Sequence, residues 1–201
     1  MRVLGIVGSM RKNGQTDALV RRVVDAMSAA SPSLTAEFLH AADWTVSPCR
    51  VTCSAYCRSH PFECSIEDDV PVVLRQMADA DAIVLGVPQY FRAPPARFHA
   101  LAERLISASF FHESQGDDPA RSPVAGTPCG LVAVAEYSNP HGMLEYLHDF
   151  ATLLGMRPIL LDRFPYLGVG GHGVVEDDEV FHPFERTGEL AAGLLRALTP
   201  T

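Results

Sequence analysis

Near its amino end the chain reads Val3-Leu-Gly-Ile-Val-Gly-Ser-Met-Arg-Lys-Asn-Gly-Gln-Thr16. Its first half is a short apolar run typical of a buried strand, and apolar residues at helical spacing follow the polar half. A loop between a strand and a helix presents backbone N–H groups and the positive end of the helix dipole, which favour an anion. The hydroxyls of Ser9 and Thr16 and the guanidinium of Arg11 are further donors for that ligand. The sequence therefore predicts an anion-binding loop after the first strand.

The spacing of the glycines narrows the choice of anion. Five residues separate Gly8 from Gly14, whereas the triphosphate loop has four and then a Lys, for which Gln15 stands here. The dinucleotide fingerprint is also absent, because no third glycine follows at the right step. A terminal monophosphate fits best, and Asn13 and Gly14 complete its candidate loop. An ordinary polar turn between a strand and a helix is the alternative.

The composition limits the class of partner. The 201 residues carry a formal net charge of -8 and scattered basic residues, which form no electrostatic footprint for nucleic acid. No apolar stretch is long enough for a signal peptide or a membrane span. We therefore expect a single cytoplasmic domain over residues 1–201 whose partner is a small molecule, with neither nucleic acid nor membrane involved.

Strands and helices alternate along the chain, which predicts an α/β fold with a five-stranded parallel sheet and helices on both faces. The later strands are expected at 34–39, 82–87, 130–135 and 157–162. The helices are expected at 16–30, from 67–69 to 78, and at 94–110, 143–154 and 185–198. A surface loop is expected at 114–127 and a glycine-rich turn region at 166–175. Ligands of such sheets bind beyond the carboxyl ends of the strands, which brings loops 8–16, 88–92 and 136–142 together.

The second and third of these loops indicate what carries the phosphate. Tyr90 and Phe91 offer flat apolar surface, while Gln89, Ser138 and Asn139 offer amide and hydroxyl groups. A flat heterocycle with polar edges would fit between them. The alternative is that Tyr90 and Phe91 pack against the following helix.

The loop from Gly8 to Thr16 resembles the phosphate loop of the NADPH-dependent FMN reductases, which have a flavodoxin-like fold. The resemblance continues through Asp68-Asp69, Ala80-Asp-Ala-Ile83 with Pro88-Gln-Tyr-Phe91, and Leu153-Leu-Gly-Met156. Met10 stands where proline is common in the family, and Gln89 where a small or apolar residue is common.

The resemblance implies FMN as the cofactor and a site made of all three loops. It assigns Ser9, Arg11, Gln15 and Thr16 to the phosphate. Residues Pro88, Gln89, Tyr90 and Phe91 would then lie along the isoalloxazine, with Tyr137, Ser138 and Asn139 near its other edge. It also implies a homodimer or homotetramer in which a neighbouring subunit helps to close the flavin site.

A cysteine-rich insertion at about residues 45–67 carries four thiols, Cys49, Cys53, Cys57 and Cys64. Four thiolates are what a [4Fe–4S] cluster or a four-coordinate zinc ion requires. Their steps of four, four and seven residues indicate a wrapping loop, because a straight helix would spread the first three over about 12 Å. The segment resembles that of the iron–sulfur flavoproteins, so we expect a [4Fe–4S] cluster; zinc and unmetallated thiols are the alternatives. Cys129 opens a strand and is expected in the core.

The function expected is an FMN-dependent NAD(P)H oxidoreductase that reduces a quinone-like or other small acceptor, with a ferredoxin-like carrier as a partner of the cluster. No side chain need be catalytic, since the cofactor carries the chemistry. Two other classes remain alternatives: a flavodoxin-like electron carrier or redox sensor that turns over no substrate, and a zinc-stabilised binding module without flavin.

Overall fold

The computed structural model describes residues 1–60, 62–110, 122–173 and 181–199. Its sheet has six parallel strands in the order β2-β1-β3-β4-β5, with β6 also paired to β4. The strands are β1 Arg2–Val7, β2 Thr35–His40, β3 Ala82–Pro88, β4 Pro128–Ala135, β5 Arg157–Pro158 and β6 Val169–His172. This is the flavodoxin-like order, in which the chain reverses direction across the sheet between β1 and β3. The predicted fold class is confirmed.

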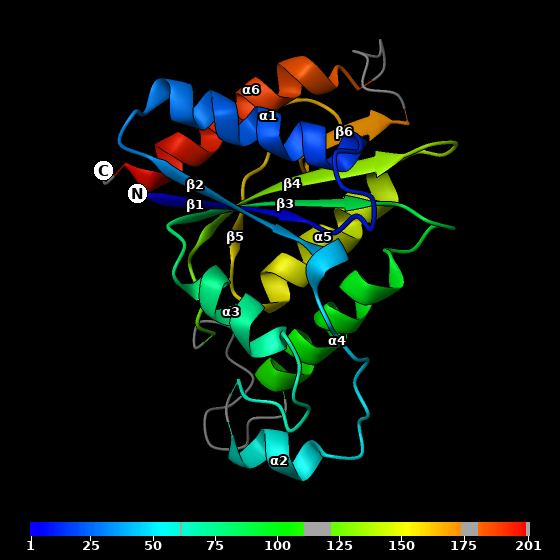
Figure 1. Cartoon of the computed structure of the whole chain (residues 1–201). Coiled ribbons are helices and arrows are strands. Elements are labelled where there is room, and N and C mark those ends of the chain that lie inside the picture. Colours follow the sequence, from blue (N-terminus) through cyan, green and yellow to red (C-terminus); the bar gives the residue numbers. More distant parts are fainter. Residues whose placement is uncertain (61, 111–121, 174–180, 200–201) are drawn as a thin grey trace.

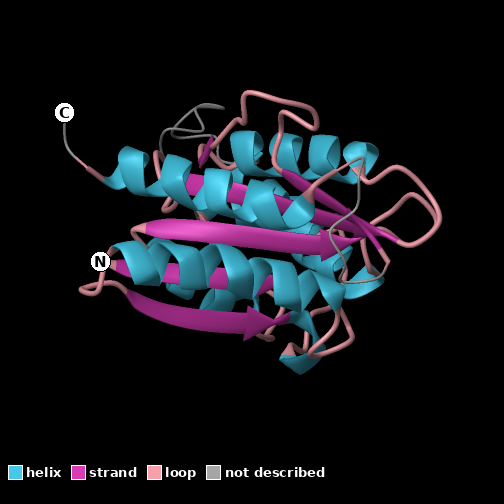
Figure 2. Cartoon of the chain, turned by 90° about the horizontal axis from the view of Figure 1, so that it is seen from above, coloured by secondary structure: helices cyan, strands magenta, loops and turns pink. Residues whose placement is uncertain are grey.

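The helices cover the two faces of this sheet. One face carries α1 Gln15–Ala30 and α6 Pro183–Leu198, and the other carries α3 Val70–Ala78, α4 Ala96–Phe110 and α5 His141–Leu153 (Figure 1). Figure 2 shows α1 and α6 from above, running along the strands. A 3-10 turn, Ala41–Asp43, follows β2, and the short α2 Ser54–Ser59 lies below α3 and α4. None of the helices in the described ranges combines the length and the apolar character that crossing a bilayer would require.

The central strands form two cores because their side chains alternate between the faces. Every residue of β3 and β4 is buried. In β3 the side chains of Ile83 and Leu85 join the core under α3, α4 and α5, while Val84 joins the core under α1 and α6. A strand covered on both faces must be apolar at every position, which explains the unbroken apolar runs in the sequence.

The helix boundaries confirm two local signals. Pro71 lies in the first turn of α3, where its missing N–H has no helical partner to lose. The helix α5 ends at Leu153, and Gly155 adopts a left-handed conformation with φ of 75° two residues later. Glycine takes that conformation without the steric cost that a Cβ atom brings.

The fifth strand position is the main departure from the predicted sheet. The strand expected at 157–162 is only Arg157–Pro158, which pairs with the start of β4. The chain then loops out and returns as β6, which pairs with the end of β4 inside the expected turn region 166–175. Residues 166 and 167 form a turn as predicted, but residues 169–172 form a strand, so the prediction was wrong for this part. Glycine allows the close approach just before the strand, because a Cβ on Gly168 would lie 2.3 Å from the carbonyl oxygen of Leu131.

Two expected segments are only partly described. The surface loop expected at 114–127 is seen from 122, where it turns into β4, and its earlier part lies outside the described residues. Residues 174 and 175, the end of the expected glycine-rich turn, lie outside them as well.

Candidate functional site

The predicted phosphate loop lies at the carboxyl edge of the sheet, where the strand order reverses. The N–H of Gly8 donates to the carbonyl of Gly86 on β3 at 2.7 Å, which fixes the start of the loop. Asp17, buried in the first turn of α1, accepts from the N–H of Asn13 at 2.9 Å and from Nε of Arg21 at 2.8 Å. Asn13 has a φ of 57° and turns the chain into the helix. The loop is thus shaped by its own sequence and by one neighbouring strand.

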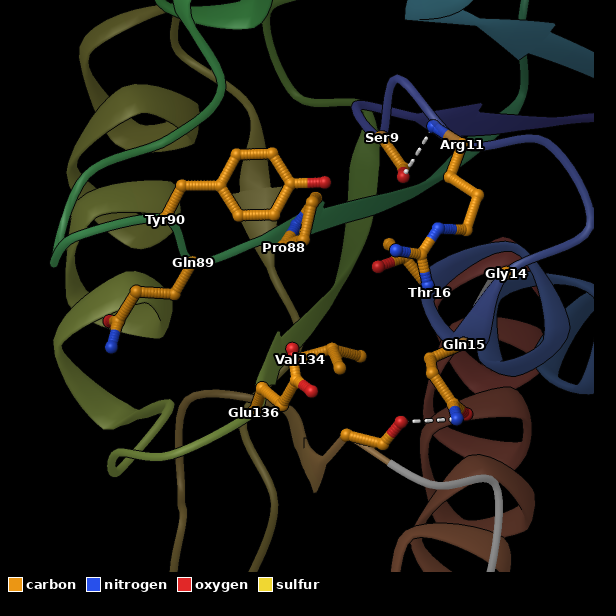
Figure 3. Close-up of a pocket in the computed structure, with 11 residues that line it drawn as sticks. Ser9, Arg11, Gly14, Gln15, Thr16, Pro88, Gln89, Tyr90, Val134 and Glu136 are labelled. Carbon is orange, nitrogen blue, oxygen red and sulfur yellow. Dashed lines mark hydrogen bonds between the residues drawn. The ribbon is translucent and has the colours of Figure 1, made fainter.

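A pocket of about 90 Å³ lies between this loop and the ends of β3 and β4 (Figure 3). It brings together four segments of the chain, and eight of the thirteen predicted phosphate and ring residues line it. Its lining consists of Ser9, Arg11, Gly14, Gln15, Thr16, Pro88, Gln89, Tyr90, Val134, Glu136 and Gly173. Asn13, Phe91, Tyr137, Ser138 and Asn139 are predicted residues that do not line it.

One wall of the pocket is suited to an anion. The hydroxyls of Ser9 and Thr16 belong to buried residues, and Ser9 Oγ accepts from the N–H of Arg11 at 3.0 Å. The Arg11 side chain is directed into the pocket (Figure 3) and has no ion pair in the parts of the chain that the structure describes. The adjacent cation differs, because Lys12 Nζ lies 2.6 Å from a carboxylate oxygen of Asp43. Arg11 is therefore the cation left available to a ligand here.

The second loop leaves β3 at Pro88 and presents its aromatic residues outward. Tyr90 lines the pocket and its side chain points toward the same space as Arg11 (Figure 3). Phe91 and Arg92 have left-handed backbone conformations, with φ of 48° and 65°. Tyr90 is 44% exposed and Phe91 is fully exposed. Packing against the following helix, the alternative explanation of Phe91, is therefore excluded.

The third loop is tied to the second by Gln89. Its Nε2 donates to Ser138 Oγ at 2.7 Å and to the carbonyl of Asn139 at 3.4 Å. Asn139 Oδ1 in turn accepts from the N–H of His141 at the start of α5, at 2.8 Å. The unusual glutamine at position 89 thus acts as a brace between the two loops.

The third loop borders a second hollow of about 510 Å³, next to the first. It is lined by Glu136, Tyr137, Ser138, Asn139, His172 and Phe181. Tyr137 is 91% exposed, and the hydrogen bond and negative charge of Glu136 raise the pKa of its phenol. Glu136 lines both spaces and connects the phosphate pocket to this open surface.

Three lining residues were not named as candidate site residues from the sequence: Val134, Glu136 and Gly173. Glu136 belongs to the loop 136–142 that was expected at the site, and Val134 at the carboxyl end of β4 could have been found, since strand ends line such sites. Gly173 follows β6, which was not predicted, and its carbonyl accepts from Nε2 of Gln15. That bond ties the start of α1 to the end of β6.

The cysteine segment lies apart from this pocket, below α3 and α4 (Figure 1). Part of it is the helix α2, so the expectation of a loop throughout was wrong. A single helical turn places Cys53 and Cys57 side by side, because residues four apart share a helix face. Cys57 is buried, and its pKa is raised first by burial and then by the charges of Cys53, Cys64 and Cys49. The other three cysteines therefore lie near enough to Cys57 for their charges to act on its thiol.

The spacing of these thiols bears on what they could hold. Among the described residues, no three His, Cys, Asp or Glu side chains converge closely enough to hold a metal ion. A single zinc ion requires four ligands at one point, whereas each cysteine around a four-iron cluster binds a different iron. Cys129 is fully buried, as expected, and burial raises its pKa to about 12.

A groove of about 550 Å³ along α4 connects the two regions. Met10 of the phosphate loop and Pro48, next to Cys49, both line it. Glu103 lines it too, and its Oε2 accepts from the N–H of Cys49 at 3.1 Å.

Comparison with known proteins gives one family and several structural neighbours. The family model described as NADPH-dependent FMN reductase matches residues 1–164. An iron–sulfur flavoprotein of Methanocaldococcus jannaschii is 30% identical over 174 residues, which are 87% of this chain and 83% of that protein. An iron–sulfur flavoprotein of Methanosarcina thermophila is 29% identical over 106 residues, 53% of each chain.

The solved structures share the fold at low identity. The crystal structure of RosB with bound 8-demethyl-8-formylriboflavin-5'-phosphate has a TM-score of 0.71 and 15% identity, and covers 98% of this chain and 79% of its own. The apo form of the NADH:FMN oxidoreductase EmoB has a TM-score of 0.60 and 14% identity, with coverage of 98% and 88%.

Proposed function

We propose, because this chain belongs to the NADPH-dependent FMN reductase family, that it is an FMN-dependent NAD(P)H oxidoreductase that also holds a [4Fe–4S] cluster. The observation that carries the flavin proposal is the convergence in one pocket of Arg11, Ser9 and Thr16 with the ends of β3 and β4. The cluster proposal draws on the neighbouring thiols and on the two iron–sulfur flavoproteins that this chain is similar to.

The volume of the pocket suggests how FMN would lie. A space of about 90 Å³ accepts a phosphate and its first carbons, whereas pockets that enclose a whole ligand of this size are about 300 to 1,000 Å³. Arg11, Ser9 and Thr16 would therefore bind the phosphate. The ring system would extend along the open surface between Pro88–Phe91 and Tyr137–Asn139.

The exposed aromatic residues at this surface support an assembly. Phe91 is fully exposed and Tyr137 nearly so, although large apolar side chains are usually covered. A second copy of the chain that packed on them would cover the ring and exclude water. We therefore propose a homodimer or homotetramer with the flavin at the interface.

FMN, when bound, supplies the hydride and single-electron chemistry. The reaction proposed oxidises NAD(P)H to NAD(P)⁺ and reduces a quinone-like or other small acceptor with two electrons and the matching protons. Arg11 would hold the phosphate, Gln89 would keep the two ring loops in register through its bond to Ser138, and Tyr90 would offer a flat surface to the ring. The side chains thus bind and orient, and none is required as an acid or base.

The cysteine segment would give the enzyme a one-electron outlet. We propose that Cys49, Cys53, Cys57 and Cys64 ligate the cluster and that a ferredoxin-like carrier exchanges electrons with it. Thiols of this kind persist in a reducing compartment, so we also propose that the protein works in the cytoplasm.

Cofactor analysis tests both proposals at once. Protein purified without oxygen and supplied with FMN, iron and sulfide should be coloured, with one FMN, four irons and four sulfides per chain. A yellow protein without iron would contradict the cluster alone. A colourless protein loaded with zinc would contradict the whole proposal.

Steady-state kinetics tests the activity. NAD(P)H oxidation should proceed over many turnovers when a quinone is present and stop when FMN is removed. If the flavin-loaded protein accepts electrons only from an added reductase, it is an electron carrier and the enzymatic proposal is wrong.

A further inference from the structure

Arg104, on α4, is the largest of the fully buried side chains in the described parts of the chain. Its side chain extends from α4 to the two ends of the cysteine segment. Its guanidinium forms an ion pair with Asp68 at 2.7 Å, and the side chains of both residues are buried. It also donates to the carbonyls of Ser47 at 3.0 Å and Ile66 at 3.3 Å. Because Ser47 precedes Cys49 and Ile66 follows Cys64, one side chain holds both ends of the segment.

The donors of this guanidinium can be counted. An arginine side chain carries five N–H groups. Nη1 donates to Ser47 and Asp68, and Nη2 donates to Ile66 and Asp68, which accounts for four of them. The fifth, on Nε, is buried and has no hydrogen-bond partner among the described residues. A buried charged donor without an acceptor is costly, so its presence indicates an acceptor that belongs there.

Cys64 is the acceptor at hand. Burial opposes the charge of Arg104, yet the hydrogen bond of Asp68 and the charge and hydrogen-bonding capacity of Cys64 raise the pKa of Arg104. Geometry points the same way, because Nη2 of Arg104 donates at 3.3 Å to the carbonyl of Ile66, which is only two residues after Cys64 in the sequence. A thiolate that ligates iron accepts hydrogen bonds, and such bonds, with the net charge nearby, set the potential of a cluster.

We propose that Arg104 is a positioning residue for the four-cysteine centre and that its Nε–H donates to the sulfur of Cys64 when that sulfur ligates the cluster. The proposal rests on the [4Fe–4S] cluster of the proposed function. The N–H···S bond and the positive charge stabilise the reduced cluster, which carries one more negative charge, so Arg104 raises the reduction potential. Asp68 partly cancels this charge and lowers the potential.

This assignment differs measurably from a purely structural role. If Arg104 only tied down the segment, its removal would loosen the cysteines and let water reach the cluster. Water stabilises the more highly charged reduced form, so the potential would rise. Loss of an N–H···S bond lowers it instead.

The test compares variants of the full-length, anaerobically reconstituted protein by potentiometric titration followed by EPR. The main variant is Arg104→Met with Asp68→Leu, because replacing both partners of a buried pair by apolar side chains is often tolerated. The second variant is Asp68→Asn, which leaves Arg104 uncompensated. The matched control is Arg97→Met, two turns earlier on α4, since Arg97 also donates to two carbonyls, of Ala41 and Ala42, at 3.0 Å.

For each of the two test variants we expect about a tenfold change in the reduction equilibrium of the cluster, which is about 59 mV for one electron. The two changes should have opposite signs. The double variant should have a lower potential at unchanged iron content, Asp68→Asn a higher one, and Arg97→Met the wild-type value. An unchanged or higher potential in the double variant would overturn it. If that variant loses its iron, Asp68→Asn decides, and an unchanged potential there overturns the assignment. Wild-type protein that takes up neither iron nor sulfide would overturn the proposed cluster and this inference together.

Discussion

The phosphate loop and the cysteine segment carry the two candidate cofactor sites and are held in different ways. The loop is held by backbone contacts to the adjacent strand and by Asp17, four residues from the N–H it accepts. The segment is held by Arg104, whose partners lie 36 to 57 residues away in the sequence. The first is a local structure on a sheet edge, and the second depends on a buried charge supplied by another helix.

This difference teaches where each site is vulnerable. A substitution at Arg11 in the phosphate loop would remove a proposed ligand contact without unfolding the protein, because the loop has its own supports. A substitution at Arg104 leaves the buried carboxylate of Asp68 without its partner. An unpaired buried charge lowers the stability of the whole fold. The substitutions predicted below each change one of these regions, and their effects on stability and on FMN binding are compared.

The largest effect is expected for Arg104→Met. The change leaves Asp68 buried without its partner, and breaking such a pair costs about 3 to 5 kcal/mol of unfolding free energy. Urea unfolding of protein without cofactors measures it. The double variant with Asp68→Leu should recover part of the loss, because it removes the unpaired charge but leaves the N–H groups of Ser47 and Val70 without their acceptor. A single variant within about 1 kcal/mol of the wild type would show that the segment is held by something else.

Arg11→Ala tests the phosphate loop. Removing its hydrogen bonds to a phosphate should cost about 1.5 to 3 kcal/mol of binding, or roughly 10- to 150-fold in the Kd for FMN, with unfolding unchanged. Fluorescence titration with FMN measures the Kd. Riboflavin, which lacks the phosphate, should bind equally to both proteins. Lys12→Ala is the control, since Lys12 is already paired with Asp43; an equal effect of both changes would contradict the assignment of Arg11.

Gly86→Ala should affect both stability and FMN binding. A Cβ there would lie 2.2 Å from Val20 and 3.1 Å from Thr16, so the start of α1 must shift. We expect a loss of about 1 to 3 kcal/mol in stability, together with weaker FMN binding. Thermal unfolding and FMN titration measure the two. Gly188→Ala in α6 is the control, because nothing lies within 4 Å of its Cβ and alanine should gain about 0.5 to 1 kcal/mol.

The smallest effect is expected from pH. Burial alone would raise the pKa of Asp68, but its hydrogen bonds with Arg104 and with the N–H groups of Ser47 and Val70 lower it below the ordinary value. A carboxyl with a lowered folded pKa stabilises the protein above its unfolded pKa, and that contribution disappears as the pH falls toward the folded pKa. The wild type should therefore lose stability relative to the Arg104→Met, Asp68→Leu variant between about pH 5 and pH 2. Parallel curves from urea unfolding would contradict it.

The strand, loop and helix at the start of the chain could be predicted from the sequence because their signals are local. An apolar run, a polar loop with Ser9, Arg11 and Thr16, and a helical pattern follow one another within a few residues. The alternation of strands and helices then predicts which loops meet, since parallel strands end at one edge of the sheet. Most of the lining residues follow from these two rules.

Other features were decided only in three dimensions. The strand β6 is rich in glycine and reads as a turn, but it is a strand because the edge of β4 is open to it and tolerates a close backbone. Gly173 joined the pocket for the same reason. The helix α2 also formed inside a segment that the sequence predicted to be a loop.

Arg104 shows most clearly what cannot be predicted from the sequence. In the sequence it is one arginine in an amphipathic helix, where a solvated surface position is the usual expectation for such a residue. Only packing reveals that it is buried against Asp68 and that its Nε–H has no hydrogen-bond partner among the described residues. The sequence determines the local loop because neighbouring residues make it. The tertiary structure determines the buried charge because its cost depends on which distant groups are brought to meet it.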